Sequence, residues 1–109
     1  MDKLSNQKCV PCEGGVLPLT KEEALNFLEQ VSGWILDEEA KQISKKFKFK
    51  DFVEAMVFVN KVADIAEKEG HHPDIKIKYN KVRIDLSTHA IGGLSVNDFI
   101  LASKIDEIN

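Results

Sequence analysis

The sequence IKIKYNKVRIDLST, from Ile75 to Thr88, is typical of a β-hairpin. Apolar residues alternate with polar or charged ones on both sides of Asn80-Lys81, a pair suited to a turn. Successive side chains of a strand point to opposite faces of a sheet, so the apolar set shares one face. The segment therefore predicts two antiparallel strands with one buried face and one solvated face.

A further hairpin is predicted upstream of this one. Residues 43–49 alternate between a mostly apolar set and a polar set, and residues 34–38 form another apolar strand. The connection through residues 39–42 is short enough to join the two strands as a hairpin.

Two shorter helices are predicted near the ends of the chain. Thr20 and Glu23 form a capping box before a helix that keeps apolar spacing to Val31 and stops at Ser32-Gly33. Ser95 caps the last helix. The core side of this helix is predicted to carry Val96, Phe99, Ile100 and Ser103, and its outer side Leu101, Ile105 and Ile108.

The longest helix is predicted from Asp51 to Glu69. Its apolar stripe comprises Phe52, Ala55, Met56, Val59, Val62, Ala63 and Ala66. Val53 and Val57 fall outside this stripe. Apolar residues on the polar side of a helix indicate a subunit contact, although isolated exposed valines are also common. We therefore expect a homo-oligomer, either a homodimer or a homotetramer.

The predicted order of elements is helix, strand, strand, helix, strand, strand, helix. Two hairpins with amphipathic helices between and after them make a four-stranded antiparallel sheet with three helices packed on one face, an α+β fold. The chain of 109 residues has room for one domain with a single core. Residues 1–18 lack periodicity and are expected to form a loosely attached N-terminal arm.

Composition argues against several classes of protein. The net charge of −3 argues against direct nucleic-acid binding, which needs a basic surface. No apolar run approaches the roughly 20 residues of a membrane span, and the polar N-terminus has no apolar signal core. We therefore expect a cytoplasmic protein that binds neither nucleic acid nor membrane.

The chain has two cysteines, Cys9 and Cys12, in a CxxC motif within the arm. A zinc site would need two further ligands, and a thioredoxin-type site would need a strand before the motif and a helix after it. Neither context is visible in the sequence. This favours reduced thiols without a metal or redox role.

Two of the three histidines, His71 and His72, are adjacent at the predicted end of the longest helix. The negative end of the helix dipole favours protonated imidazoles, which titrate near neutral pH. Pro73 favours an extended His72, so the two adjacent rings are expected to point in opposite directions. Glu67 lies one helical turn before His71, where it could orient a ring. The hairpin is expected to return His89 toward the same end of the sheet.

Most of these residues also have a purely structural interpretation. Histidines after a helix are most often a solvated cap, and a metal site would need three convergent ligands. Asp98 lies where a carboxylate completes a capping box with Ser95. Trp34 is expected in the core. Gly92-Gly93 is expected in a turn, although a glycine-rich bend before a helix is also suited to an anion.

Taken together, the residues resemble a family pattern. The spacings typical of the pterin-4a-carbinolamine dehydratases are shared by Glu67, His71-His72-Pro73, Tyr79, His89 and Asp98. Trp34 after the first helix and the leader with Cys9 and Cys12 are similar to that family as well. The resemblance therefore covers nearly the whole chain.

The resemblance implies a hydro-lyase that uses no cofactor and no metal. Its substrate is 4a-hydroxytetrahydrobiopterin, which aromatic amino acid hydroxylases leave behind. Its products are quinonoid dihydrobiopterin and water, a step of tetrahydrobiopterin recycling. Loss of water from C4a needs an acid for the departing hydroxyl and a base for the N5 proton, and imidazoles suit both tasks near pH 7.

By resemblance, His71, His72 and His89 are the catalytic positions. We expect His71 to act as the acid and His89 as its partner in proton transfer, while His72 lines the pterin pocket and shares the acid/base work. The supporting or substrate-binding residues implied are Glu67, Pro73, Trp34 and Asp98. Glu67 would orient the histidines, and Asp98 would support the site while capping its helix.

Two alternatives remain open. Some animal members of the family also act as a dimerisation cofactor for a homeodomain transcription factor, which makes a binding module one alternative. The other is a related role in molybdopterin metabolism, since lineages without an aromatic hydroxylase keep proteins of this shape.

Overall fold

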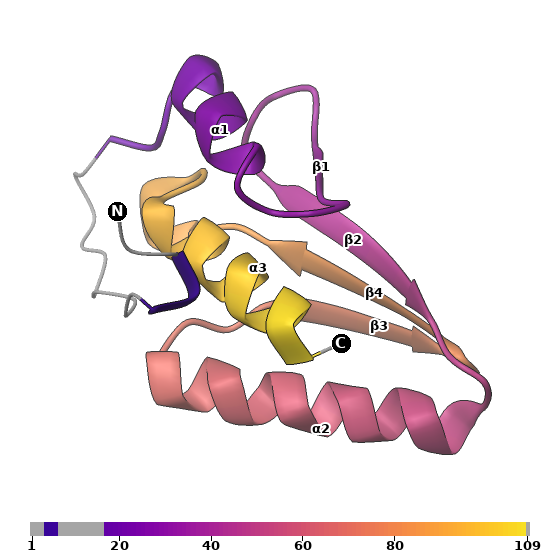
Figure 1. The fold of residues 1–109 in the computed structure, drawn as a ribbon. Coiled ribbons are helices and arrows are strands. Elements are labelled where there is room, and N and C mark those ends of the chain that lie inside the picture. Colours follow the sequence, from indigo (N-terminus) through magenta and orange to yellow (C-terminus); the bar gives the residue numbers. More distant parts are fainter. Residues whose placement is uncertain (1–3, 7–16, 109) are drawn as a thin grey trace.

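The computed structural model describes residues 4–6 and 17–108. Three helices lie on one face of a four-stranded antiparallel sheet (Figure 1). The helices are α1 (Lys21–Leu28), α2 (Phe52–Glu69) and α3 (Val96–Ile108), and the strands are β1 (Ile35–Leu36), β2 (Ile43–Lys48), β3 (Asp74–Lys78) and β4 (Lys81–Leu86). Two short 3-10 helices are η1 (Leu4–Asn6) and η2 (His89–Ile91). The predicted α+β class and order of elements are confirmed.

The strand order is β1-β2-β4-β3, so β4 pairs with a strand from each predicted hairpin. Both β2 and β3 are antiparallel to β4, with Lys45 and Ile75 both opposite Ile84. Because paired residues share a face, the register directs the alternating apolar residues of these strands toward the helices. β3, the first strand after Gly70, lies at one edge of the sheet and pairs with the central strand β4.

Two strand boundaries differ from the prediction. β1 has two residues rather than five, because the Asp37 carboxylate accepts the backbone N–H groups of Lys41 and Gln42 and closes the loop early. The β3–β4 turn is Tyr79-Asn80, one residue earlier than predicted. Asn80 is held to the end of the neighbouring strand, since its side-chain amide donates to the Phe49 carbonyl and its own carbonyl accepts the Phe49 N–H.

The capping box that starts α1 is confirmed. Glu23 N–H donates to the Thr20 hydroxyl at 3.2 Å, and Thr20 N–H donates to the Glu23 carboxylate at 2.9 Å. The helix ends at Leu28, earlier than the predicted Val31. After Leu28 the chain forms a tight turn, in which the backbone N–H groups of Gln30 and Val31 donate to carbonyls three residues back, so Val31 lies outside the helix.

The core contact of α2 differs from the predicted stripe, because it includes Phe58, which was not predicted, and fewer of the predicted residues. Its buried residues are Ala55, Phe58, Val62 and Ala66. Phe58 packs on Phe47 of β2 with ring centroids 4.6 Å apart. Phe52 and Ala63, which were expected in the stripe, are exposed. Because the buried positions recur every three or four residues, the helix presents a single face to the sheet.

The third helix, α3, is the most deeply buried element. Leu101 and Ile105 are fully buried, although they were expected on its outer side. The helix contacts both α1 and α2, and η1 packs against it as well. Leu4 of η1 is 4% exposed and belongs to the core, within the segment expected to be a loosely attached arm. Because α3 is covered from several sides, its sequence does not show a polar face that would distinguish an outer side from a core side.

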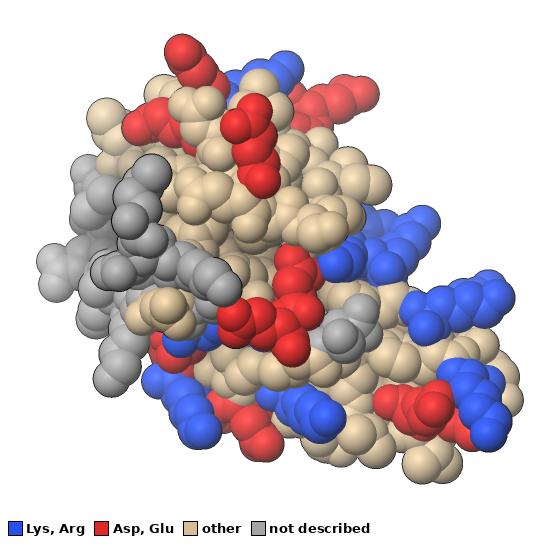
Figure 2. All heavy atoms as spheres, viewed as in Figure 1, with Lys and Arg blue, Asp and Glu red and all other residues tan. Residues whose placement is uncertain are grey.

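The opposite face of the sheet is not covered by any described helix (Figure 1). Charge is distributed unevenly over the surface: Lys and Arg side chains project beyond the strands on the right of Figure 2, whereas Asp and Glu predominate around α1 at the top. Among the helices that the structure describes, none has the length and apolar character of a membrane span. Cys9 and Cys12 lie outside the described residues.

Candidate functional site

The end of α2 places His71. Gly70 adopts the left-handed conformation, with φ of 66°, as its position after the helix predicts. The backbone N–H groups of Gly70 and His71 both donate to the Ala66 carbonyl, His71 at 3.2 Å. The chain therefore leaves the helix in a defined direction, and His71 is anchored to the last helical turn.

His71 meets Asp98, a carboxylate in the first turn of α3. His71 Nε2 lies 2.6 Å from Asp98 Oδ1. The His71 side chain is 13% exposed and that of Asp98 is 0% exposed. Because a carboxylate only accepts hydrogen bonds, Nε2 carries a proton and Nδ1 is the ring nitrogen left for other contacts. A short, buried pair of this kind fixes both the orientation and the tautomer of the ring.

The second oxygen of Asp98 is also fully engaged. Oδ2 accepts the Thr88 hydroxyl at 2.8 Å and the Ser95 backbone N–H at 3.0 Å. The hydroxyl groups of Thr88 and Ser95 lie 2.9 Å apart. Three donors and the N-terminal end of α3 stabilise a buried negative charge at this position. Asp98 therefore caps its helix and holds His71 with the same carboxylate.

Sequence reasoning did not identify Thr88 as part of this network. Thr88 is 4% exposed and follows Val82, Ile84 and Leu86 on the buried side of β4. A polar residue on the apolar side of a strand is the signal that could have revealed it, because a buried hydroxyl needs a partner.

His89 lies next to Thr88 in a separate hollow. It is exposed at the start of η2. A hollow of about 300 Å³ lies between the loop after β1 and the loop after β4, and is lined by Asp37, Glu39, Lys41, Gln42, Ser87, Thr88, His89, Gly92 and Gly93. That volume is at the small end of ligand pockets. Thr88 both lines the hollow and contacts Asp98, so the hollow borders the His71 network.

His72 points to a different carboxylate from His71. Its Nε2 lies 3.5 Å from Glu67 Oε1, and the two side chains are 62% and 79% exposed. At that distance and exposure the pair has little energetic weight. Glu67 therefore lies beside His72 rather than His71, and the adjacent rings have separate surroundings. Pro73, between His72 and β3, is half-buried.

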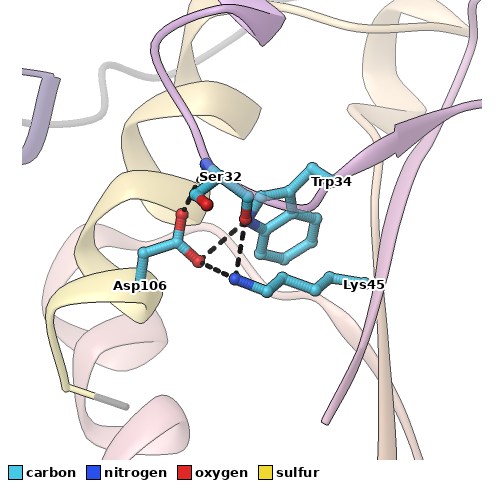
Figure 3. Close-up of polar contacts among 4 residues, drawn as sticks. All are labelled: Ser32, Trp34, Lys45 and Asp106. Carbon is cyan, nitrogen blue, oxygen red and sulfur yellow. Dashed lines mark hydrogen bonds and ion pairs between the residues drawn. The ribbon is translucent and has the colours of Figure 1, made fainter.

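Trp34 contacts a part of α3 that is distant from Asp98 (Figure 3). Its indole Nε1 donates to Asp106 Oδ1 at 3.0 Å, and Lys45 Nζ donates to the same oxygen at 2.8 Å. The other oxygen of Asp106 accepts the Ser32 backbone N–H. Asp106 is eight residues beyond Asp98, or about 12 Å along the helix axis. The structure places Trp34 in the core and does not bring it to His71.

In the described parts of the chain, no three His, Cys, Asp or Glu side chains gather in a way that could hold a metal ion. The histidine nearest to a buried carboxylate, His71, meets a single carboxylate that is already engaged by two other donors. This arrangement is suited to orienting an imidazole for proton transfer.

Comparison with known proteins identifies the family of this chain. The family model described as pterin 4 alpha carbinolamine dehydratase matches residues 17–108. A Halorhodospira halophila protein, provisionally named a pterin-4-alpha-carbinolamine dehydratase, is 47% identical over 105 residues, covering 96% of both chains. A Nitrosomonas eutropha protein with the same provisional name is 53% identical over 104 residues, covering 94% of this chain and 90% of its own.

Two solved structures have the same fold. One, from Brucella melitensis, is described as a transcriptional coactivator/pterin dehydratase; it is 36% identical, has a TM-score of 0.79 and covers 84% of this chain and 97% of its own. The other is a pterin dehydratase-like protein described as a RuBisCO assembly factor; it is 21% identical, has a TM-score of 0.61 and covers 70% of this chain and 88% of its own. The second shows the fold alone. From the family model and these relatives, the chain belongs to the pterin-4-alpha-carbinolamine dehydratase family.

Proposed function

We propose that this chain dehydrates 4a-hydroxytetrahydropterins, with 4a-hydroxytetrahydrobiopterin as the substrate and tetrahydrobiopterin recycling as the pathway. Membership of the family supports dehydratase activity. The observation that carries the chemical proposal is the 2.6 Å contact between His71 and the fully buried Asp98. It supplies an imidazole of fixed orientation whose Nε2 proton is held by a carboxylate.

His71 is the proposed acid. With Nε2–H held by Asp98, a protonated ring presents its second proton on Nδ1. That proton passes to the 4a-hydroxyl, the C4a–O bond breaks, and water leaves. The N5 lone pair forms the C4a=N5 double bond, and a base removes the N5 proton. The buried Asp98 carboxylate holds the ring through Nε2, so that Nδ1 is the nitrogen that faces the substrate in this role.

His89 is the proposed base for the N5 proton. It lines the hollow beside Thr88, whose hydroxyl contacts Asp98. A pterin ring in that hollow would contact His89 and would border, through Thr88, the network that holds His71. His72, being exposed beside Glu67, would contact the outer part of the substrate and share the proton transfer.

The test is the dehydration of synthetic 4a-hydroxytetrahydropterin, followed by its ultraviolet absorbance, with the wild type and with His71→Ala, His89→Ala and His72→Ala. We expect kcat to fall by about 10²–10⁴-fold for His71→Ala and for His89→Ala, the usual contribution of one acid or base. His72→Ala should have a smaller effect, because its ring is largely in solvent. Full activity of His71→Ala would refute the assignment, and an inactive wild type would refute the proposed function.

We also propose that the chain assembles as a homodimer or homotetramer. Val53 and Val57 of α2 are 70% and 51% exposed, and Phe52 beside them is 49% exposed. A shallow hollow that includes Phe49, Val53, Val57 and Ile108 continues this apolar surface. A contiguous patch of large apolar side chains is unusual on a monomer and supports an interface.

A further inference from the structure

The uncovered face of the sheet is strongly basic. The register of β2, β3 and β4 places alternate residues of these strands on the side away from the helices. The basic side chains on that side, which we call the lysine face, are Lys46, Lys48, Lys76, Lys78, Lys81 and Arg83. They are six of the 15 Lys and Arg residues of the chain. Asp74 and Asp85, opposite each other, mark one end of this face.

The cations of the lysine face are available to a partner. All five lysines are exposed. Within the part of the chain that the structure describes, the ion pairs at 4.0 Å or less do not include any of them; Arg83 alone is paired, with Asp85 at 2.9 Å. Five like charges on neighbouring strands repel one another, so the arrangement is unfavourable unless an anion binds there.

The lysine face is also hollowed. A hollow of about 320 Å³ is lined by all six cations together with Phe47 and Val82. A second hollow of about 450 Å³ adjoins it toward β1 and shares Lys46 and Arg83. The first hollow forms a trough on the side of the sheet opposite α3 and Asp98, and the second continues to the β1 edge, where Lys45 also contacts Asp106 of α3. The proposed catalytic site and this trough are therefore separate surfaces.

The net charge of −3 does not show that the basic residues gather on one face, because acidic residues predominate elsewhere, for example around α1 (Figure 2).

A protein partner would be expected to meet Arg, Tyr or Trp, since Lys is depleted at protein interfaces. A single strand of nucleic acid would be expected to meet aromatic rings on which bases stack. The described strand residues that point to this side include no aromatic side chain, because Phe47, which borders the hollow, is 5% exposed and faces the helices. Lysines act instead as point charges toward phosphates.

We propose that the lysine face binds the phosphate backbone of a nucleic-acid duplex without sequence preference. A duplex carries the densest array of phosphates, about one charge per 1.7 Å of its axis, and can be bound by charge alone. The affinity is modest and strongly salt-dependent. This function is additional to the proposed dehydration and does not depend on it.

The test is fluorescence anisotropy of a labelled 20-base-pair random-sequence DNA duplex with the full chain, between 50 and 200 mM salt. Each lysine that neutralises a phosphate contributes a slope of about −0.9 to log K against log[salt], so five lysines predict a slope of about −4.5. Lys46→Gln/Lys76→Gln/Lys78→Gln should weaken binding at 50 mM salt on the order of 10²–10³-fold and make the slope shallower by about 3.

The matched control is Lys21→Gln/Lys61→Gln/Lys68→Gln, which removes the same charge from exposed lysines of α1 and α2. It should keep the affinity and slope of the wild type. Both triple variants should melt as the wild type does by circular dichroism and retain its dehydration rate. The proposal is overturned if the duplex does not bind at 50 mM salt, or if the control loses as much affinity as the lysine-face variant. Displacement of the duplex by polyglutamate of equal charge concentration would indicate an acidic protein partner instead and would overturn it as well.

Discussion

The substitution Asp98→Asn tests the role of the buried carboxylate most directly. In the wild type, Oδ2 accepts two donors, from Thr88 and Ser95, and Oδ1 faces His71 Nε2. The asparagine has one accepting oxygen and one donating amide. Its oxygen will take the position with two donors, because the reverse would face an NH₂ group toward two other donors. Its amide then donates to His71 Nε2, which must give up its proton.

The consequence for catalysis follows from the tautomer. His71 becomes a neutral ring with its proton on Nδ1, and the imidazolium form is excluded because Nε2 faces a donor. A neutral imidazole is a far weaker acid than an imidazolium. We therefore expect kcat to fall by about 10²–10⁴-fold, the contribution of one general acid, with little change in KM.

The free energy of unfolding should change less in Asp98→Asn than the activation free energy of the reaction. Two hydrogen bonds to a charged oxygen become bonds to a neutral one, and each loses about 1 kcal/mol. The free energy of unfolding should fall by about 2 kcal/mol, which lowers Tm by roughly 10 °C. Both effects are measurable, since a fold of this size stays folded at 25 °C after such a loss.

The assay combines kinetics with NMR. The dehydration rate gives kcat and KM, and ¹⁵N spectra of the His71 ring report which nitrogen carries the proton. Asp106→Asn is the matched control, because Asp106 is a carboxylate of the same helix that accepts three donors away from His71. It should lose comparable stability and keep kcat. A wild-type kcat in Asp98→Asn, with the ring proton shown on Nδ1, would refute the reasoning.

Three further predictions concern the fold and its assembly. Burial raises the pKa of Asp85, but hydrogen bonds from Ser44 and Arg83 and the nearby positive charges outweigh it and hold that pKa below the ordinary value of 3.8. The ionised Asp85 carboxylate therefore stabilises the fold above about pH 4, and this stabilisation is lost as pH falls through the lowered pKa. In urea titrations from pH 7 to pH 2, Asp85→Asn should have a lower free energy of unfolding than the wild type at neutral pH and should lose less of it on acidification. The same dependence of the free energy of unfolding on pH in variant and wild type would contradict this. Gly70→Ala should cost about 1–2 kcal/mol by thermal melting, because φ is 66° while the space around the new Cβ is open. Val53→Asp/Val57→Asp should lower the mass measured by light scattering at micromolar concentration, and a monomeric wild type would exclude the α2 interface.

Much of the fold follows from local patterns. The alternation in residues 43–49 and 75–88 predicted the strands, because a sheet with one wet face needs polar residues at every second position. The Thr20 capping box and Gly70 marked helix ends, because their effects act within one turn. The bounds that were wrong depend on contacts across the fold: Asn80 bonded to Phe49, for example, decides where the β3–β4 turn lies.

For the candidate site, too, local sequence patterns identified some features and contacts across the fold decided others. Spacing identified His71, His72 and His89 as residues of interest, and Pro73 suggested that the adjacent rings face different ways. Spacing did not show that Asp98 rather than Glu67 holds His71, since 27 residues separate the two partners. Trp34 was grouped with the site by resemblance, but Asp106 draws its indole toward a more distant turn of α3.

The sequence by itself determined the element order, the helix caps and the family, because these depend on neighbours within a few residues or on fixed spacings. Only the tertiary structure decided which carboxylate orients which histidine, and that α3 is buried from several sides. It also brought the lysines of three strands, up to 35 residues apart in the chain, onto one uncovered face. The physical reason is that hydrogen bonding, burial and charge act on distances in space, which the order of residues alone does not contain.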